Sequence, residues 1–576
     1  IVVFLPVALS DSLITPIIAP FAMIVVIAII LSTLTALTIV PLLTSRFSKL
    51  ENNGGFKWWR SFIHLFEKSI SGFSGFIMQL LQWSFRHKFI TLGIATVLFI
   101  SSIILPAGGF IGSEFLSVGD IGEGIVRLEY PQYYTLSQNN QITRRIEELI
   151  SQKPEVANIY ASVGSTSGLL LSQSGSHLSE INIKLIDKTQ RNISSDVFMK
   201  KLEDDIEETF PDVKARAATV TILGGADETP IQIVFQSVNT DTLYAFAERM
   251  SEKISRIPGT SSVKLSIEGG FPEVVIKIDK EKMARLGLSP EVVGSTIHTS
   301  FSGNTNSKFQ SGDYEYDINV RLDAFNRKSL IDVENLTFLN HFGQTVKLKQ
   351  FAEINEQTGT SQRERFGRVS SVILESKALG RAVGDIGKDI IVLLDNTDFP
   401  EGVSYLPYGD LKYQDEAFGS LGSALWIAIV LVYLILVALY ENYLHPFVVL
   451  FSIPLSIIGA LYSLALTQQA LTLFSMLGMI ILVGLVTKNA ILVVDFTNQL
   501  RKEGKDIKDA LFIAVELRLR PILMTAISTV VGMLPIALSQ GAGSEWKSGL
   551  GWVLIGGITS SMFLSLIIVP LIYLLA

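Results

Sequence analysis

Seven long runs of apolar residues divide the chain, and each is close to the length that an α-helix needs to cross a bilayer. A helix rises about 1.5 Å per residue, so about 20 apolar residues span a hydrocarbon core of about 30 Å. Residues 1–9 resemble the end of one more membrane helix. The runs that predict membrane-spanning helices are 17–44, 89–106, 421–440, 446–466, 471–498, 520–540 and 550–575.

The longest stretch between two apolar runs, residues 107–417, has the patterns of a mixed α and β domain. Within it, residues 122–220 alternate between period-2 and period-3.6 patterns in the order strand, helix, strand, strand, helix, strand, as in a ferredoxin-like split βαβ unit. A second copy occupies 231–268 and 368–409, interrupted by an insert. We therefore predict an α-helical polytopic membrane bundle plus an α+β domain of ferredoxin-like βαβ repeats with an inserted subdomain.

Positive charges predict the orientation of the chain. Residues 45–88 and the loop 501–520 are rich in lysine and arginine, so both belong in the cytoplasm by the positive-inside rule. Counting spans between them places 107–417 on the opposite side of the membrane. Residues 56–85 mix bulky aromatic residues with scattered cations, which favours a helix lying in the membrane interface over a helix packed on the bundle.

Composition agrees with a polytopic membrane protein: 48% of the 576 residues are hydrophobic and 18% are charged. The absence of cysteine excludes a disulfide framework and any thiolate metal site. The net charge of −7 is diffuse, and no basic patch interleaved with aromatic residues indicates nucleic acid binding. Because the first residue is Ile and no charged segment precedes the apolar stretch, we expect no signal peptide and interpret the chain as part of a longer protein.

Lys488 is the most informative residue, because it lies inside the apolar segment GLVTKNAILVVDF. An ammonium group at membrane depth costs a few kcal/mol, about 2.5–3.5 on insertion scales, so it normally faces a bundle interior and has a partner. Ion coupling or a structural ion pair is favoured over a lysine that extends its side chain to the headgroups, because the inner end of the run is two to three helical turns away.

Five stretches of the chain carry a resemblance to a known family: ALYENYLHPFVVLFSIPLSIIGA, GLVTKNAILVVDF, LRLRPILMTAISTVVGMLPIALSQGAGSE, GSEFLSVGD and IDKEKMARLGLSPEVV. They resemble the resistance–nodulation–cell division (RND) superfamily, and specifically its hydrophobe/amphiphile efflux (multidrug) branch. The resemblance covers essentially the whole chain and implies the C-terminal part of a pump with twelve transmembrane helices and two periplasmic excursions. The first four helices and the first excursion would lie outside this chain.

The resemblance implies a proton-driven antiporter in a bacterial inner membrane that takes amphiphilic compounds or drugs from the periplasm or outer leaflet. In such pumps a lysine of the tenth helix pairs with two aspartates of the fourth, and Lys488 matches that lysine. Arg518 and Thr525 match the family's proton relay. Alternatively, Arg518 is simply one of the cytoplasmic cations that the positive-inside rule predicts, and the hydroxyl of Thr525 donates a hydrogen bond to the carbonyl four residues back in its own helix. The side chain of Asn489 could form a hydrogen bond to another helix or within its own helix.

With the family's terms, the expected domains follow from the patterns above. They are the end of one transmembrane helix and a complete second one over 1–44, a cytoplasmic interfacial helix over 45–88, a transmembrane helix over 89–106, a first periplasmic porter subdomain over 107–227, a second porter subdomain over 228–271 and 359–410, an inserted docking subdomain over 272–358, and five transmembrane helices over 418–576.

The resemblance also implies a substrate pocket and switch loop in the first porter subdomain. The corresponding stretch is VANIYASVGSTSGLLLSQSGSH, in which hydroxyl residues stand where further aromatic residues would be expected. Its Gly/Ser-rich loop 164–176 could gate a pocket or be a plain surface loop. This departure makes aliphatic amphiphiles, lipids or molecules like bile salts as plausible as aromatic drugs. The implied pocket and loop residues are Tyr160, Gly164, Ser165, Ser167 and Gly168.

A homotrimer working with a periplasmic adaptor (membrane fusion) protein and an outer-membrane channel is the expected assembly, with no cofactor. Heavy-metal efflux is the nearest alternative and would need soft thioether ligands, of which the first repeat holds only Met199. A non-pumping translocation accessory is a further alternative. Hydrolytic chemistry has no support, since neither a nucleophile elbow nor a Walker loop is present, so energy would come from an ion gradient.

Overall fold

A computed structural model describes residues 2–8, 15–47, 57–117, 119–131, 134–166, 173–220, 229–267, 271–312, 314–359 and 363–576. The chain folds into two compact units. The first comprises Ile1–Phe235, Ala245–Lys264 and Leu374–Ala576, and the second comprises Gln236–Tyr244 and Leu265–Ile373.

Seven helical spans in the described residues are long and apolar enough to cross a membrane, and each overlaps one of the seven predicted runs. A short helix, α1 (Leu5–Ala8), precedes them, and its neighbours Val3 and Phe4 are buried in the core of the bundle. The chain is therefore a multi-pass membrane protein, as predicted. The spans are α2 (Thr15–Phe47), α4 (Lys88–Ala107), α12 (Asp410–Tyr440), α13 (Leu444–Leu450) with α14 (Ser452–Leu466), α15 (Leu473–Lys502), α16 (Ile507–Ala537) and α17 (Glu545–Leu575).

The fourth span is broken, although its apolar run predicts a single helix. The break falls at Phe451, between α13 and α14. Pro454 explains it, because proline has no amide hydrogen to donate to the carbonyl of Leu450 and its ring crowds that carbonyl. The hydroxyl of Ser452 instead donates to the carbonyl of Val449 at 2.7 Å.

Small residues let α14, α15 and α17 approach closely. A Cβ added to Gly459 of α14 would lie 2.1 Å from the carbonyl oxygen of Gly556 in α17. A Cβ added to Gly557 would lie 2.3 Å from the side chain of Leu482 in α15. Close backbone approach of this kind is the usual way that membrane helices gain packing energy.

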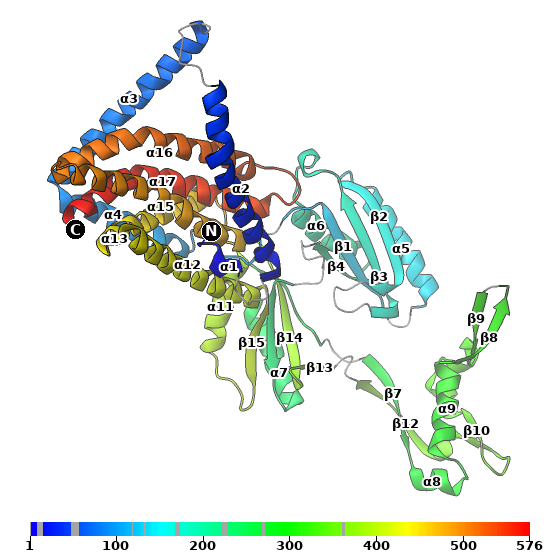
Figure 1. Cartoon of the computed structure of the whole chain (residues 1–576). Coiled ribbons are helices and arrows are strands. Elements are labelled where there is room, and N and C mark those ends of the chain that lie inside the picture. Colours follow the sequence, from blue (N-terminus) through cyan, green and yellow to red (C-terminus); the bar gives the residue numbers. More distant parts are fainter. Residues whose placement is uncertain are drawn as a thin grey trace. The chain divides into compact units, whose positions relative to one another are not determined.

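The segment expected to form the first porter subdomain is a four-stranded antiparallel sheet with two helices on one face (Figure 1). The strand order β2-β3-β1-β4 is that of a ferredoxin-like fold and confirms the predicted fold class. Ile146, Ile150, Phe198 and Leu202 from the two helices pack on the sheet and form its core. The elements are β1 (Glu123–Glu129), α5 (Leu136–Ser151), β2 (Val156–Thr166), β3 (Gln173–Leu185), the 3-10 helix η1 (Lys188–Gln190), α6 (Ser195–Thr209) and β4 (Lys214–Thr219).

The second repeat forms a sheet with the strand order β13-β14-β5-β15, and β6 also pairs with β14. Four of these strands therefore repeat the arrangement of the first sheet. The elements are β5 (Ile231–Gln236), α7 (Thr240–Ile254), β6 (Thr260–Leu265), β13 (Glu364–Phe366), β14 (Val369–Ala378), α11 (Val383–Asp395) and β15 (Ser404–Gly409).

The inserted segment has its own small core around Phe338, Leu348 and Phe351. Ser289 and Pro290 separate two short helices. Ser289 caps the second helix by accepting a hydrogen bond from the amide of Val292, and Pro290 is the first residue of that helix. The elements are β7 (Phe271–Ile278), α8 (Lys280–Arg285), α9 (Pro290–Phe301), β8 (Asn304–Ser311), β9 (Tyr314–Val320), η2 (Ala324–Arg327), α10 (Leu330–Glu334), β10 (Thr337–Leu339), β11 (Thr345–Lys347), η3 (Leu348–Gln350) and β12 (Ala352–Gly359).

The amphipathic segment before α4 forms one long helix, α3 (Lys57–Arg86). In its second half, Ile77 and Leu81 are fully buried in the core of the bundle. The rings of Phe73 and Phe85 contact Phe563 of α17 and Phe512 of α16. This half of the helix therefore packs on the bundle, and a position in the membrane interface stays a prediction for the rest.

Candidate functional site

Lys488 lies near the middle of α15, about 20 Å of helix from either end. Its side chain is exposed on a stripe that includes Leu485 and Asp495, whereas the neighbouring Thr487 and Asn489 are buried. The four-carbon stem of a lysine is far shorter than the helix on either side of it. The position of Lys488 therefore disfavours a side chain that reaches the headgroups.

Arg518 of α16 leans against α15. Its guanidinium lies 4.5 Å from the centre of the Phe496 ring, two helical turns beyond Lys488. The Nε atom is buried without a hydrogen-bond partner among the described residues. Arg518 therefore packs between two membrane helices. The positive-inside rule alone predicts a cation on the cytoplasmic side but does not predict this packing.

Thr525 and Asn489 are not joined to the two cations. The hydroxyl of Thr525 donates to the carbonyl of Ile522 at 3.1 Å, one helical turn back, which is close to the local alternative considered above. Asn489 is buried in α15. Within the described ranges, no hydrogen bond or ion pair connects Lys488 with Arg518, Thr525 or Asn489.

The predicted switch loop is shorter than the sequence suggests, because β2 continues to Thr166 and β3 begins at Gln173. Gly164 sits at an irregularity of this hairpin with φ +91, a conformation that glycine adopts readily, and Ser165 pairs with Ser174. The expectation of a loop over 164–176 is therefore wrong at both ends. The predicted pocket residues Ser167 and Gly168 lie outside the described residues.

Tyr160 lies on β2 and is 69% exposed. Its neighbours Ile159 and Ala161 pack against the hydrophobic core, so alternation along the strand places Tyr160 on the face of the sheet away from the helices. The same face carries Arg127 of β1, whose Nε lies 3.1 Å from the buried carboxylate of Glu180 on β3.

A narrow cleft adjoins this face, between the first sheet and strands β6 and β14 of the second repeat. Its cavity of about 70 Å³ is well below the roughly 300–1,000 Å³ of sites that hold a small molecule, so the cleft is closed here. Its charged lining is mainly basic, with Arg127, Arg216, Lys264 and Lys377 beside two carboxylates, Glu203 and Glu375; Ile125, Ala218, Thr229 and Ser262 complete it.

Lys377 holds the two sides of the cleft together. Its Nζ lies 3.2 Å from the carboxylate of Glu203 and donates to the carbonyl of Ala217 at 2.8 Å. Glu203 in turn accepts the amide of Ala217 at 2.9 Å, so both backbone groups of this edge-strand residue are satisfied. Burial alone would raise the pKa of Glu203, but the Ala217 amide and the Lys377 and Lys200 ammonium groups hold it below its usual value.

The sequence reasoning missed the basic residues of this cleft. The available signal was an arginine placed between two apolar residues in each of two strands, GIVRLE and KARAAT. Because side chains alternate between the two faces of a strand, each arginine must face away from the helix-covered side of the sheet. Lys264 and Lys377 come from the second repeat, and no local pattern links them to the first.

The family model of the AcrB/AcrD/AcrF family matches residues 1–576. The chain belongs to this family of RND transporters. It is 29% identical over 583 residues to "Swarming motility protein SwrC" of Bacillus subtilis (strain 168), with all of this chain and 53% of that protein covered. The chain therefore spans about half the length of the curated relative it matches.

Two solved structures share the fold. Both are X-ray crystal structures of a heavy metal efflux pump, in crystal forms II and I, with TM-scores of 0.82 and 0.80. Each is 21% identical to this chain, and each match covers all of this chain and 56% of the solved chain. At this identity the likeness establishes the arrangement of helices and sheets.

The thioethers of residues 107–417 lie in hydrophobic cores. Met199 is 1% exposed, Met250 2% and Met283 4%. Met199 also fills the space above Gly124, where an added Cβ would lie 2.5 Å from its sulfur. Among the described residues, no group of three or more histidine, aspartate or glutamate side chains is placed to hold a metal ion.

Proposed function

We propose that this chain is the C-terminal part of a proton-driven pump that exports amphiphilic compounds or drugs across the cell envelope. The observation that carries the proposal is the place of Lys488 in the middle of a membrane-spanning helix. An ammonium at this depth is costly and normally faces the interior of a bundle, where a carboxylate is its strongest partner. In the complete pump, carboxylates of a helix outside this chain would be that partner, as the family resemblance implies.

A proton can drive this arrangement through simple electrostatics. The ammonium of Lys488 keeps facing carboxylates ionised, because an opposite charge lowers their pKa. When protons neutralise those carboxylates, the attraction is lost and the helices repack. Arg518, Thr525 and Asn489 are proposed members of the proton path, with Arg518 closest to the cytoplasmic end and already packed against α15 through Phe496.

The cleft between the two porter subdomains is the proposed entry for substrate. Opening requires the Lys377 contacts with Glu203 and Ala217 to break, and it would expose basic side chains beside the apolar Ile125. Such a lining suits an amphiphile with an anionic or polar head. The hairpin residues Tyr160, Gly164, Ser165, Ser167 and Gly168 are proposed to contribute the switch segment.

Amphiphiles are favoured over metal ions because the methionines that a soft metal would need are buried in cores. For the assembly we propose a homotrimer in the inner membrane. Its segment 272–358 would dock a periplasmic adaptor protein and an outer-membrane channel. A translocation accessory would share the fold without moving amphiphiles.

The proposal is tested by Lys488→Ala in the complete pump, produced in cells that lack their own efflux pumps. Accumulation of a fluorescent anionic amphiphile and resistance to bile salts and other anionic detergents are measured. We expect Lys488→Ala to abolish export at unchanged membrane abundance. Lys502→Ala, which removes the same charge at the end of the same helix, should retain it. Normal export by Lys488→Ala would refute the coupling role, and resistance restricted to copper or silver salts would favour the metal alternative.

A further inference from the structure

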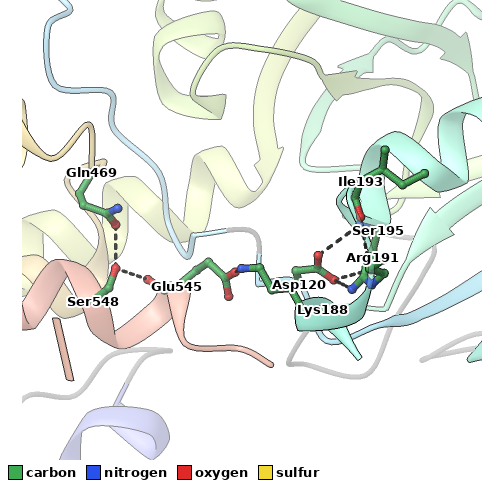
Figure 2. Close-up of polar contacts among 8 residues, drawn as sticks. All are labelled: Asp120, Lys188, Arg191, Ile193, Ser195, Gln469, Glu545 and Ser548. Atoms are coloured by element: carbon green, nitrogen blue, oxygen red, sulfur yellow. Dashed lines mark hydrogen bonds and ion pairs between the residues drawn. The ribbon is translucent and has the colours of Figure 1, made fainter. Parts of the chain in front are cut away.

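An ion pair connects the first porter subdomain directly to a membrane helix. Lys188, in the 3-10 helix η1, pairs with Glu545, the first residue of α17 (Figure 2). The two residues are 357 positions apart in the sequence. Their side chains are 36% and 24% exposed, so the pair is partly protected from solvent.

The subdomain side of this contact is fixed by a buried polar cluster. Asp120 accepts hydrogen bonds from the Arg191 guanidinium and from the hydroxyl of Ser195 (Figure 2). The side chain of Arg191 is 1% exposed and also donates to the carbonyls of Ile186 and Ile193, each at 3.1 Å. The turn that carries Lys188 is therefore held to the segment through which the chain enters the subdomain.

The start of α17, which carries Glu545, is also held in place by several contacts. Trp546 packs on Gly119 so closely that an added Cβ would lie 2.3 Å from the indole Nε1. The amide of Gly543 donates to the backbone carbonyl of Asp120 at 3.4 Å. The hydroxyl of Ser548 donates to Gln469 at 2.8 Å, which ties the start of α17 to the turn after α14 (Figure 2).

Close glycine contacts continue the connection from α17 to the helix of Lys488. A Cβ added to Gly549 of α17 would lie 2.8 Å from the hydroxyl of Ser475 in α15. Gly478 of α15 and Gly557 of α17 are in similar contact with Val553 and Leu482 of the opposite helix. Such close-packed interfaces deform little, so α15 and α17 are expected to move as one body.

We propose that the Lys188–Glu545 ion pair and the Trp546–Gly119 contact form a coupling joint, through which α17 moves the first porter subdomain when α15 is repositioned. Lys188 and Glu545 act as positioning residues: they touch neither substrate nor proton but keep the subdomain attached to the moving helices. This inference rests on the proposed function. It adds the path by which movement of α15 in the membrane is transmitted to the cleft.

Charge reversal tests the ion pair in the complete pump reconstituted in lipid vesicles. Lys188→Glu and Glu545→Lys should each reduce proton-driven transport of a fluorescent amphiphile by about tenfold, within the roughly 5–150-fold range of couplings between sites. The double reversal should restore at least half of it. Lys184→Glu is the matched control, since Lys184 is 64% exposed on the adjoining β3. Single reversals that transport as well as this control would overturn the proposal.

Cross-linking tests whether the joint stays closed during transport. This experiment does not use charge reversal, so it does not depend on whether the protein tolerates reversed charges. The chain contains no cysteine, so Lys188→Cys with Glu545→Cys supplies the only two thiols of this segment. A disulfide requires Cα atoms within about 7 Å, so a short reducible bis-thiol reagent is used to bridge two positions joined by long side chains.

The joint predicts that the cross-linked pump transports at the rate of the unmodified pump, before and after reductant. Loss of transport that reductant restores would show that the contact must open in each cycle, which contradicts the proposal. Wild-type pump in the same vesicles separates the two ideas: if it moves no amphiphile under a proton gradient, the proposed function fails rather than the joint.

Discussion

Replacing Glu114 with glutamine should remove a pH-dependent destabilisation at the point where the chain leaves α4 for the first porter subdomain. Glu114 lies in a segment tied to the connection between α14 and α15, since its amide donates to the carbonyl of Leu471 at 3.1 Å. Burial, followed by the nearby carboxylates of Asp385 and Asp410, raises the pKa of Glu114 from 4.5 to about 7. Asp385 itself pairs with Lys388 at 3.4 Å.

The sign and size of the effect follow from linkage. Between pH 4.5 and 7 the folded protein holds a proton on Glu114 that the unfolded chain releases, so stability falls as the pH rises through this window. A shift of this size corresponds to about 3.5 kcal/mol at pH 8, at roughly 1.4 kcal/mol per pKa unit. Glutamine cannot ionise, so Glu114→Gln should be the more stable form at pH 8, and its advantage should disappear at pH 5.

Thermal unfolding of the complete pump in detergent, compared between pH 5 and pH 8, measures the stability difference. Infrared difference spectra identify the group directly, because the protonated carboxyl band that Glu114→Gln removes should titrate near pH 7. A band that titrates near pH 4.5, or a variant less stable than the wild type at both pH values, would refute the reasoning. Glu123→Gln serves as the control because this carboxylate is half exposed on β1.

Three further outcomes are expected. Glu203→Gln should lower the free energy of unfolding of the pump by about 1–3 kcal/mol at neutral pH, because it weakens the group that accepts hydrogen bonds from Lys377 and from the Ala217 amide. Since the folded protein lowers the pKa of Glu203, this loss of stability should shrink as the pH falls through the usual pKa range of a glutamate. Gly556→Ala should reduce the amount of folded pump in membranes, since its Cβ would lie 2.3 Å from the Gly459 carbonyl, whereas Gly532→Ala, with nothing within 4 Å, should be tolerated. Thr135→Ala should speed hydrogen exchange at the start of α5 by removing a capping box that stabilises it by about 1 kcal/mol; unchanged exchange there would contradict the role of the cap.

Much of the fold could be predicted because it depends on local patterns. Apolar runs of sufficient length located all seven spans, and alternating periods located the six elements of the first porter subdomain in order. The break at Phe451 was not predicted, although Pro454 is visible in the sequence, since proline within an apolar run is often tolerated in membrane helices.

Less of the candidate site could be predicted, because its contacts join distant parts of the chain. Lys488 stands out alone as a cation in an apolar run, and Arg518 and Thr525 entered only through a family resemblance. The stacking of Arg518 on Phe496 depends on how α15 and α16 pack. The Lys188–Glu545 pair and the basic cleft join segments more than a hundred residues apart, and no periodicity in one sequence relates such positions.

The hairpin formed by β2 and β3 shows a different limit. Its glycine and serine content is typical of a flexible loop, yet Gly164 and Ser165 belong to a strand. Pairing with β3 provides backbone hydrogen bonds that composition does not reveal, and the positive φ of Gly164 fits a bulge in that pairing.

The central claim, that protonation of carboxylates facing Lys488 drives export, is tested most directly by proton flux. The complete pump is reconstituted in vesicles that contain a pH-sensitive dye, a pH gradient is imposed, and an amphiphile is added. The account predicts that the amphiphile accelerates proton movement through the wild-type pump and through Lys502→Ala, and has no effect on Lys488→Ala. Equal acceleration in the Lys488→Ala pump would contradict it.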